Sequence, residues 1–161
     1  MADEILSQEQ EIENSENAQT SGNLQRCLTF ESNGLVMYMS TDYVIEIIND
    51  HNITPVPLVP SYVSGIINLR GQVVPVVDIR VLMDEEVKEY TSKTCIIILT
   101  IDGTTMGIIV DNVRQVVDID LDDVHPIPVR QRKKLLTGML NMSDGTVAMA
   151  FDCEALMNVQ M

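Results

Sequence analysis

The hydrophobic pattern of the chain is dominated by two apolar runs that lie on either side of a short polar cluster. The first run ends at Ile66 and Ile67, the second covers residues 73–77, and the cluster between them runs from Asn68 to Gly71. Most of the apolar residues are β-branched, which favours strands, and a polar interruption is typical of a hairpin turn. Runs that lack polar alternation suit strands buried on both faces, as in a small barrel. The pattern predicts a buried strand pair that turns at Arg70 and Gly71.

Two further hairpins are predicted where an Asn-Gly or an Asp-Gly pair separates apolar stretches. The stretches 26–30 and 35–40 flank the pair at 33–34, and the stretches 95–101 and 106–110 flank the pair at 102–103. Both dipeptides readily adopt the positive φ angles of tight hairpin turns. The chain therefore reads as mainly β.

Short helical turns are predicted at two places. Thr41 is a candidate N-cap for a turn over residues 43–48, where the apolar positions are spaced to share one helical face. Asp78 is a candidate cap for a short helix through residues 81–83. Three prolines between residues 55 and 60 exclude regular strand pairing and predict an extended crossover.

These features recur in the same order in the second half of the chain. Asn33-Gly34 returns as Asp102-Gly103, 69 residues later, and the offset grows to 74 for Asp78 and Asp152. Such ordered matches indicate an internal duplication. Each half supplies about five strands, too few to bury much core alone. We therefore expect two small five-stranded barrels packed around a shared core, with short helical turns, in a domain at 24–161. The repeats cover about 25–84 and 94–158, and the pattern leaves open an exchange of strands between them.

Charge is unevenly distributed along the chain. The net charge is −14, from 24 acidic and 10 basic residues, which argues against nucleic-acid binding because that affinity rests on Lys and Arg. Residues 1–23 carry six acidic side chains and no basic one, so they are predicted to be a disordered acidic tail. Four of the ten bases lie within residues 130–134, a run that reads either as a solvated loop or as a patch that steers an acidic partner.

Cysteine usage and the lack of apolar segments indicate the compartment. The three cysteines are an odd number without a Cys-x-x-Cys pair, so free thiols in a reducing compartment are expected. The first residues lack the basic start of a signal peptide, and no apolar run approaches the ~20 residues of a membrane helix. We expect a cytoplasmic protein that is not inserted in a membrane.

Candidate catalytic chemistry is sparse. His51 and His125 are the only histidines, and neither has a cysteine or histidine neighbour at metal-ligand spacing. No serine lies in a nucleophile elbow, and no glycine-rich loop is present to hold phosphate. The sequence therefore predicts no catalytic residues, no metal and no cofactor.

The stretch from Gly65 to Arg80 also resembles a known family signature. The segment Gly-Ile-Ile-Asn-Leu-Arg-Gly-x-Val-Val-Pro-Val-Val-Asp-Ile-Arg is similar to the signature of CheW, the bacterial chemotaxis coupling protein. The resemblance extends over about residues 24–157. It implies two five-stranded barrels and a noncatalytic adaptor that binds the cytoplasmic tip of a chemoreceptor and the regulatory domain of the chemotaxis histidine kinase. Such an adaptor is associated with receptor arrays at the inner face of the membrane.

The resemblance also implies partner-binding positions. They fall into three groups, on the first barrel, on the signature hairpin and on the second barrel: Val44, Glu46 and Ile47; Gly65, Asn68, Arg70 and Gly71; Gly107, Val113 and Val116. For the valines and glycines, plain core and turn roles are equally compatible with the sequence. Arg70 has no matching base in the second repeat, which favours a recognition role over an ordinary solvated turn.

Two other classes of function stay open on the sequence alone. An enzyme or small-ligand protein would use a groove between the barrels and would need a compact pocket with convergent titratable groups. An RNA-binding barrel would need a basic groove with exposed aromatic side chains.

Overall fold

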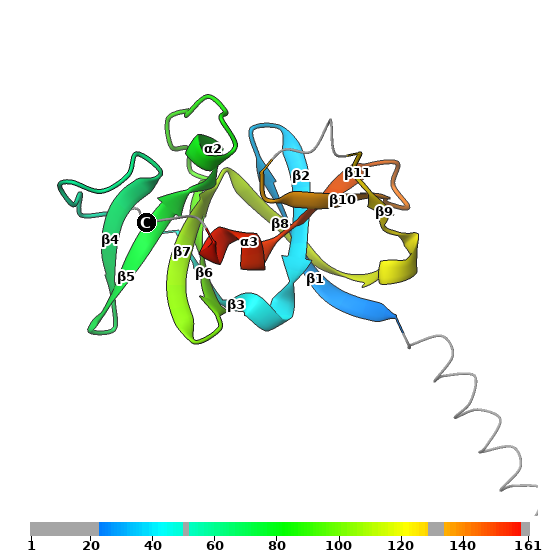
Figure 1. Ribbon diagram of the computed structural model, residues 1–161, viewed down its shortest axis with the longest axis horizontal. Helices are drawn as coiled ribbons and strands as arrows, with labels where there is room; N and C mark the ends of the chain where they lie inside the picture. The colour runs from blue at the N-terminus through cyan, green and yellow to red at the C-terminus, as the bar shows by residue number, and fades with distance from the viewer. Residues whose placement is uncertain (1–22, 50–51, 129–133, 159–161) are drawn as a thin grey trace, which may run out of the picture.

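The protein consists of two β-sheets with a few short helices, as Figure 1 shows. The computed structural model describes residues 23–49, 52–128 and 134–158. The predicted disordered tail, except Asn23, and all of the basic run except Lys134 lie outside these residues. The elements are β1 (Leu24–Ser32), β2 (Leu35–Ser40), η1 (Thr41–Tyr43), β3 (Val44–Ile48), β4 (Val63–Leu69), β5 (Gln72–Asp78), α2 (Ile79–Leu82), β6 (Cys95–Ile101), β7 (Thr104–Val110), β8 (Asn112–Asp120), η2 (Leu121–Asp123), β9 (His125–Pro126), β10 (Leu136–Asn141), β11 (Val147–Phe151) and α3 (Cys153–Met157).

Each sheet combines a hairpin from one half of the chain with strands from the other half. The five-stranded sheet has the order β3-β6-β7-β5-β4, and the six-stranded sheet has the order β8-β1-β2-β11-β10-β9 (Figure 1). The β6–β7 hairpin thus completes the sheet of the first half, and the β1–β2 hairpin completes that of the second. A duplicated unit with exchanged hairpins would produce this arrangement, although the duplication itself stays a prediction.

The mainly β fold class is confirmed, whereas the predicted barrels are not. Strand pairing runs from β3 to β4 in one sheet and from β8 to β9 in the other, and no pairing among the described strands closes either sheet. Closed barrels therefore stay a prediction. One sheet has six strands rather than five because the two-residue strand β9 pairs with β10. An isolated bridge between Thr54 and Ile66 occupies the corresponding place beside β4.

Three apolar clusters explain why the strands lack polar alternation. The largest is shared by the two sheets and includes Phe30, Ile97 and Leu99. Each sheet also has a smaller cluster on its other face, with Ile96 and Ile98 in the five-stranded sheet. Successive residues of a strand point to opposite faces, so β6 contributes alternately to two clusters. Strands buried on both faces need apolar residues at every position.

The three predicted hairpins are present, but the first predicted helical turn is wrong. Only η1 is helical, and the chain continues directly into strand β3, which pairs with β6. The helical spacing over 43–48 was misleading because most of these residues are β-branched and lie beside β6, where strand pairing outweighs a local pattern. The cap is Ser40 rather than Thr41, since its side chain accepts a hydrogen bond from the Asp42 amide.

The predicted cap at Asp78 is confirmed, and the matching Asp152 caps a second short helix. The Asp78 side chain accepts a hydrogen bond from the backbone N–H of Arg80 at the start of α2. The Asp152 side chain accepts one from the backbone N–H of Ala155 at the start of α3. Both aspartates follow the last strand of their half, so each ends a strand and begins a helix.

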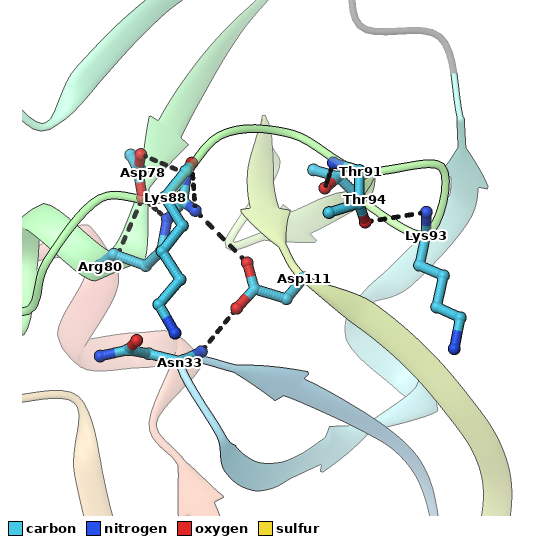
Figure 2. Close-up of polar contacts among 8 residues, drawn as sticks. All are labelled: Asn33, Asp78, Arg80, Lys88, Thr91, Lys93, Thr94 and Asp111. Atoms are coloured by element: carbon cyan, nitrogen blue, oxygen red, sulfur yellow. Dashed lines mark hydrogen bonds and ion pairs between the residues drawn. The ribbon is translucent and has the colours of Figure 1, made fainter.

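Arg80 forms a buried ionic cluster where the two sheets meet (Figure 2). Its guanidinium contacts both carboxylate oxygens of Asp78 at 3.0 Å, and Nη1 lies 3.3 Å from Oδ1 of Asp111, the residue that links β7 to β8. Asp111 in turn accepts a hydrogen bond of 2.7 Å from the backbone N–H of Asn33, in the β1–β2 turn. The hydrogen bonds to Asp78 raise the pKa of Arg80 despite its burial. The cluster therefore connects a helix of one sheet to a turn of the other.

All three cysteines are free and buried. Burial, reinforced by nearby carboxylates, raises the pKa of Cys27 to about 11 and that of Cys153 to about 12. The neutral thiol is therefore the form that the fold retains, and a neutral buried thiol is a poor nucleophile.

We predict that iodoacetamide at pH 8 leaves all three thiols of the native protein unmodified over a time in which the urea-unfolded protein reacts fully. Mass spectrometry of the alkylated chain measures this. Rapid alkylation of the native protein would contradict the burial.

The raised pKa values of the thiols also affect the pH dependence of stability. The stability contributed by the protonated thiols is present below about pH 9 and is lost as pH rises toward 12, because only the unfolded chain ionises in that window.

Candidate functional site

An ion pair connects the signature turn to strand β3 of the five-stranded sheet. Nη2 of Arg70 lies 2.7 Å from Oε2 of Glu46 on β3, and the arginine side chain is 80% exposed while the glutamate side chain is 22% exposed. The pair joins β3 and the β4–β5 turn, which belong to opposite edges of the sheet. Two predicted groups of partner-binding residues are therefore brought together here.

The backbone of the turn holds Arg70 in an outward position. Arg70 has a φ of 53° and Gly71 a φ of 86°, and the Gly71 amide donates a hydrogen bond of 2.8 Å to Oδ1 of Asn68. Positive φ at two successive residues is what a type I′ hairpin loop of two residues requires. Asn68 and Gly71 thus shape the turn, and Arg70 is the side chain that it presents.

Apolar side chains are exposed on both elements that this ion pair joins. On the edge strand β3, where a register shift lies between Val44 and Glu46, Ile45 is 51% exposed and Ile47 is 40% exposed. Val73 on β5, just after the turn, is 62% exposed. Val44 is half-buried and packs against the shared core. We call Ile45, Glu46, Ile47, Arg70 and Val73 the β3 surface.

Two of the three glycines among the predicted site residues, Gly65 and Gly107, are buried, so neither is placed to touch a partner. A Cβ on Gly65 would lie 2.2 Å from the carbonyl oxygen of Thr54, and a Cβ on Gly107 would lie 2.7 Å from Cγ2 of Ile96. Both glycines permit a close approach of neighbouring chain. Their role in this structure is to shape the sheet.

Val113 and Val116 lie apart from the β3 surface. Both are on β8, an edge strand of the six-stranded sheet that pairs irregularly with β1. Val113 is half-buried and packs against the shared core, whereas Val116 is 51% exposed. Of this pair, Val116 is the residue that a partner could reach.

The second half also has an ionic contact between an edge strand and a hairpin turn, with the charges reversed. Nη2 of Arg114 on β8 lies 3.9 Å from Oδ2 of Asp144 in the β10–β11 turn. In the first half the acid is on the edge strand and the base on the turn. The β10–β11 turn thus presents an acid, whereas Arg70 gives the β4–β5 turn a positive charge.

Two cavities lie within the separate halves, away from the groove predicted between them. The first, of about 370 Å³, is lined by Ile48, Asn52, Ile53, Thr54, Ile67 and Asn68. The second, of about 310 Å³, lies between β8 and the β10–β11 turn and is lined mainly by polar and acidic residues. Among the described residues no group of three or more His, Cys, Asp or Glu side chains could hold a metal ion. His125 is exposed on β9, and His51 lies outside the described residues.

A family model supplies the deciding comparison. The model of the CheW-like domain matches residues 26–161, which include both sheets and the β3 surface. The chain belongs to the CheW family.

Individual relatives agree with this assignment. Chemotaxis protein CheW of Bacillus subtilis is 33% identical over 104 residues, covering 65% of this chain and 67% of that protein. Chemotaxis protein CheW of Thermotoga maritima is 28% identical over 129 residues, covering 80% and 85%. The match to CheW of Klebsiella aerogenes, 31% identical over 99 residues, covers 60% of each chain. The chain spans about half the length of two further curated relatives.

The fold is likewise shared with a solved member of the CheW family. The crystal structure of the scaffolding protein TtCheW from Thermoanaerobacter tengcongensis superposes with a TM-score of 0.73 at 27% identity, covering 79% of this chain and 88% of that chain. The two-sheet architecture is therefore that of a CheW scaffold.

Sequence reasoning missed two side chains of the β3 surface and the buried arginine. Ile45 and Val73 could have been found by reading residues 44–48 and 73–77 with a period of two, which separates inward from outward positions. Arg80 stands at the end of the CheW signature, where its spacing from Asp78 was the available signal.

Within the described residues no helix is both long and apolar enough to cross a membrane.

Proposed function

We propose that the chain is a noncatalytic adaptor that couples methyl-accepting chemoreceptors to the chemotaxis histidine kinase by binding both. Its membership of the CheW family and its similarity to a protein described as a scaffold support this function. The relatives are named as chemotaxis proteins, so the enzymatic or small-ligand alternative is not supported.

The observation that carries the proposal is the β3 surface. Exposed isoleucine side chains on β3 and an exposed valine on β5 accompany a cation that a rigid turn holds in solvent. An apolar patch with a charged rim is the usual composition of a protein interface, where charge sets specificity and rate. The partners proposed for this chain are the cytoplasmic tip of a chemoreceptor and the regulatory domain of the kinase.

Coupling would follow from geometry. Two partners held on one rigid body raise each other's local concentration, so simultaneous occupancy places the kinase under receptor control without a new contact between them. The buried Arg80 cluster supports this mechanism because it fixes one sheet against the other. We place the adaptor in receptor arrays at the cytoplasmic face of the membrane.

The test is the substitution Arg70→Glu. We predict that it weakens binding of a receptor tip fragment and of the kinase regulatory domain by about tenfold or more, since it reverses the charge that the turn presents. The melting temperature should change by no more than about 2–4 °C, because exposed ion pairs contribute only ~0–1 kcal/mol. NMR titration measures both affinities, and thermal melts measure stability.

Arg26→Glu is the matched control. Arg26 is also exposed and lies 3.8 Å from Asp118, but on the six-stranded sheet. It should leave both affinities unchanged. Assembly of Arg70→Glu with wild-type affinity would remove Arg70 from the site, and a collapsed melt would assign it a structural role.

A further inference from the structure

Leu58, in the crossover between β3 and β4, combines two unfavourable features. Its φ is 61°, in the left-handed region, and the residue is fully exposed at 104% of its reference surface. A branched apolar side chain is strained in this region, which glycine and asparagine occupy readily. No residue in the described part of the chain offsets that strain by burying the side chain.

Other residues with positive φ show how unusual this is. Asn33, Asp84 and Asp102 are small polar residues, which tolerate the conformation. Leu135 also has a positive φ, of 70°, but it is buried in the shared core, so burial compensates for the strain. Within the described residues, Leu58 is the apolar residue that has positive φ and full exposure together.

The crossover is built to hold Leu58 in place. Pro55, Pro57 and Pro60 restrict the backbone on both sides of it. At the base of the loop, Thr54 and Ile66 exchange two backbone hydrogen bonds of 2.8 and 2.9 Å, and the Val63 amide donates to the Pro60 carbonyl at 3.0 Å. A backbone that is already restricted loses little further entropy on binding, which favours affinity.

The surroundings of Leu58 are uncharged. Residues 52–69 contain no Asp, Glu, Lys or Arg, in a chain where 21% of residues are charged. The neighbouring Val59 is 38% exposed. Depletion of charge around apolar anchors is typical of the centre of protein interfaces. A lipid surface is a poor candidate partner because the chain carries a net charge of −14 and would be repelled by anionic headgroups.

We propose that Leu58, with Val59, is an apolar anchor that inserts into an uncharged pocket of the kinase regulatory domain. This inference rests on the proposed function, which offers two protein partners. A protruding side chain needs a concave pocket, and a globular domain provides one. A helical receptor tip would instead need a groove on this chain for its own side chains. Holding Leu58 in the conformation that this contact needs strains the backbone, and the strain lowers the stability of the unbound protein.

The first arm of the test measures stability. Leu58→Asn places a residue that tolerates positive φ at this position, so the full chain should melt about 2–4 °C higher than wild type. Leu58→Met keeps an apolar side chain and should show no such rise. A lower melting temperature for Leu58→Asn would overturn the strain argument.

The second arm measures binding by titration calorimetry with the isolated kinase regulatory domain and, separately, a receptor tip fragment. Leu58→Asn should weaken kinase-domain binding by about tenfold or more, as loss of a buried leucine anchor does. Leu58→Met should stay within about twofold of wild type. Leu121→Asn is the matched control, because Leu121 is also exposed, at 51%, but lies in η2 at the far sheet.

The outcomes separate the two proposals. If Arg70→Glu weakens binding while Leu58→Asn does not, the adaptor function stands and the anchor is refuted. If Leu58→Asn selectively weakens receptor binding, or abolishes self-association seen in sedimentation, the assignment to the kinase is wrong. If the wild-type chain binds neither probe, the adaptor function and the anchor fall together.

Discussion

Replacing Arg80 with leucine is expected to lower the free energy of unfolding by about 3–5 kcal/mol, the usual cost of removing one partner from a buried ionic cluster. The side chain is 1% exposed and contacts Asp78 and Asp111. Its Nη1 also donates to the Lys88 carbonyl at 3.1 Å, and its guanidinium lies 5.9 Å from the Tyr90 ring. Without the arginine, the Asp78 carboxylate stays buried with no cation. Urea denaturation followed by circular dichroism measures the loss.

Two comparison variants isolate the cause of that loss. Arg26→Leu removes an exposed pair and should cost less than about 1 kcal/mol. Arg80→Lys keeps the charge but cannot contact both oxygens of Asp78 in the same planar geometry, so it should fall between Arg80→Leu and wild type. If Arg80→Leu were as stable as Arg26→Leu, the cluster would not hold the two sheets together.

The second large effect is expected for Gly65→Ala. The added Cβ would lie 2.2 Å from the backbone oxygen of Thr54, and Gly65 has a φ of 148°, where other residues are strained. Because the opposing atom belongs to the backbone, relief requires the strand or the crossover to move. Strain and overpacking together predict a loss of about 2–5 kcal/mol in the free energy of unfolding, measured by the same urea titration.

Gly103→Ala is the control for Gly65→Ala. Gly103 also has a positive φ, of 79°, but a Cβ there meets no atom within 4 Å. Only the conformational term remains, so the loss should be about 1 kcal/mol. Equal losses in the two variants would show that the close contact with Thr54 relaxes at no cost.

Hairpins and caps were predictable from the sequence because their causes are local. Asn33 and Asp102 each precede a glycine between two apolar strands, a local pattern that is enough to predict positive φ. Asp78 caps its helix through the backbone N–H of Arg80, only two residues away. Strand β3 was missed for the opposite reason. Its partner β6 lies some 50 residues along the chain, so the helical spacing at 43–48 carried no sign of the pairing.

The candidate site was predictable in part. Comparison of the repeats singled out Arg70, whose contact with Glu46 on β3 could not be read from their separation of 24 residues. The role of Arg80 was hidden because Asp111 is 31 residues away and is linked in turn to Asn33. The backbone angle of Leu58 could not be foreseen either, since the prolines indicated a crossover without fixing which residue would be strained.

The exchange of hairpins between the sheets also constrains how the chain can assemble during its synthesis. When β5 leaves the ribosome, the first half still lacks the β6–β7 hairpin that lies between β3 and β5. The β1–β2 hairpin likewise waits for β11, near the end of the chain, before its second edge is paired. Pairing over such separations pays a loop-closure cost before it gains any contact, so such topologies fold slowly. Neither sheet can therefore be completed before strands from the other half of the chain have been synthesised. A nascent chain released before residue 110 would expose unpaired strand edges to neighbouring chains.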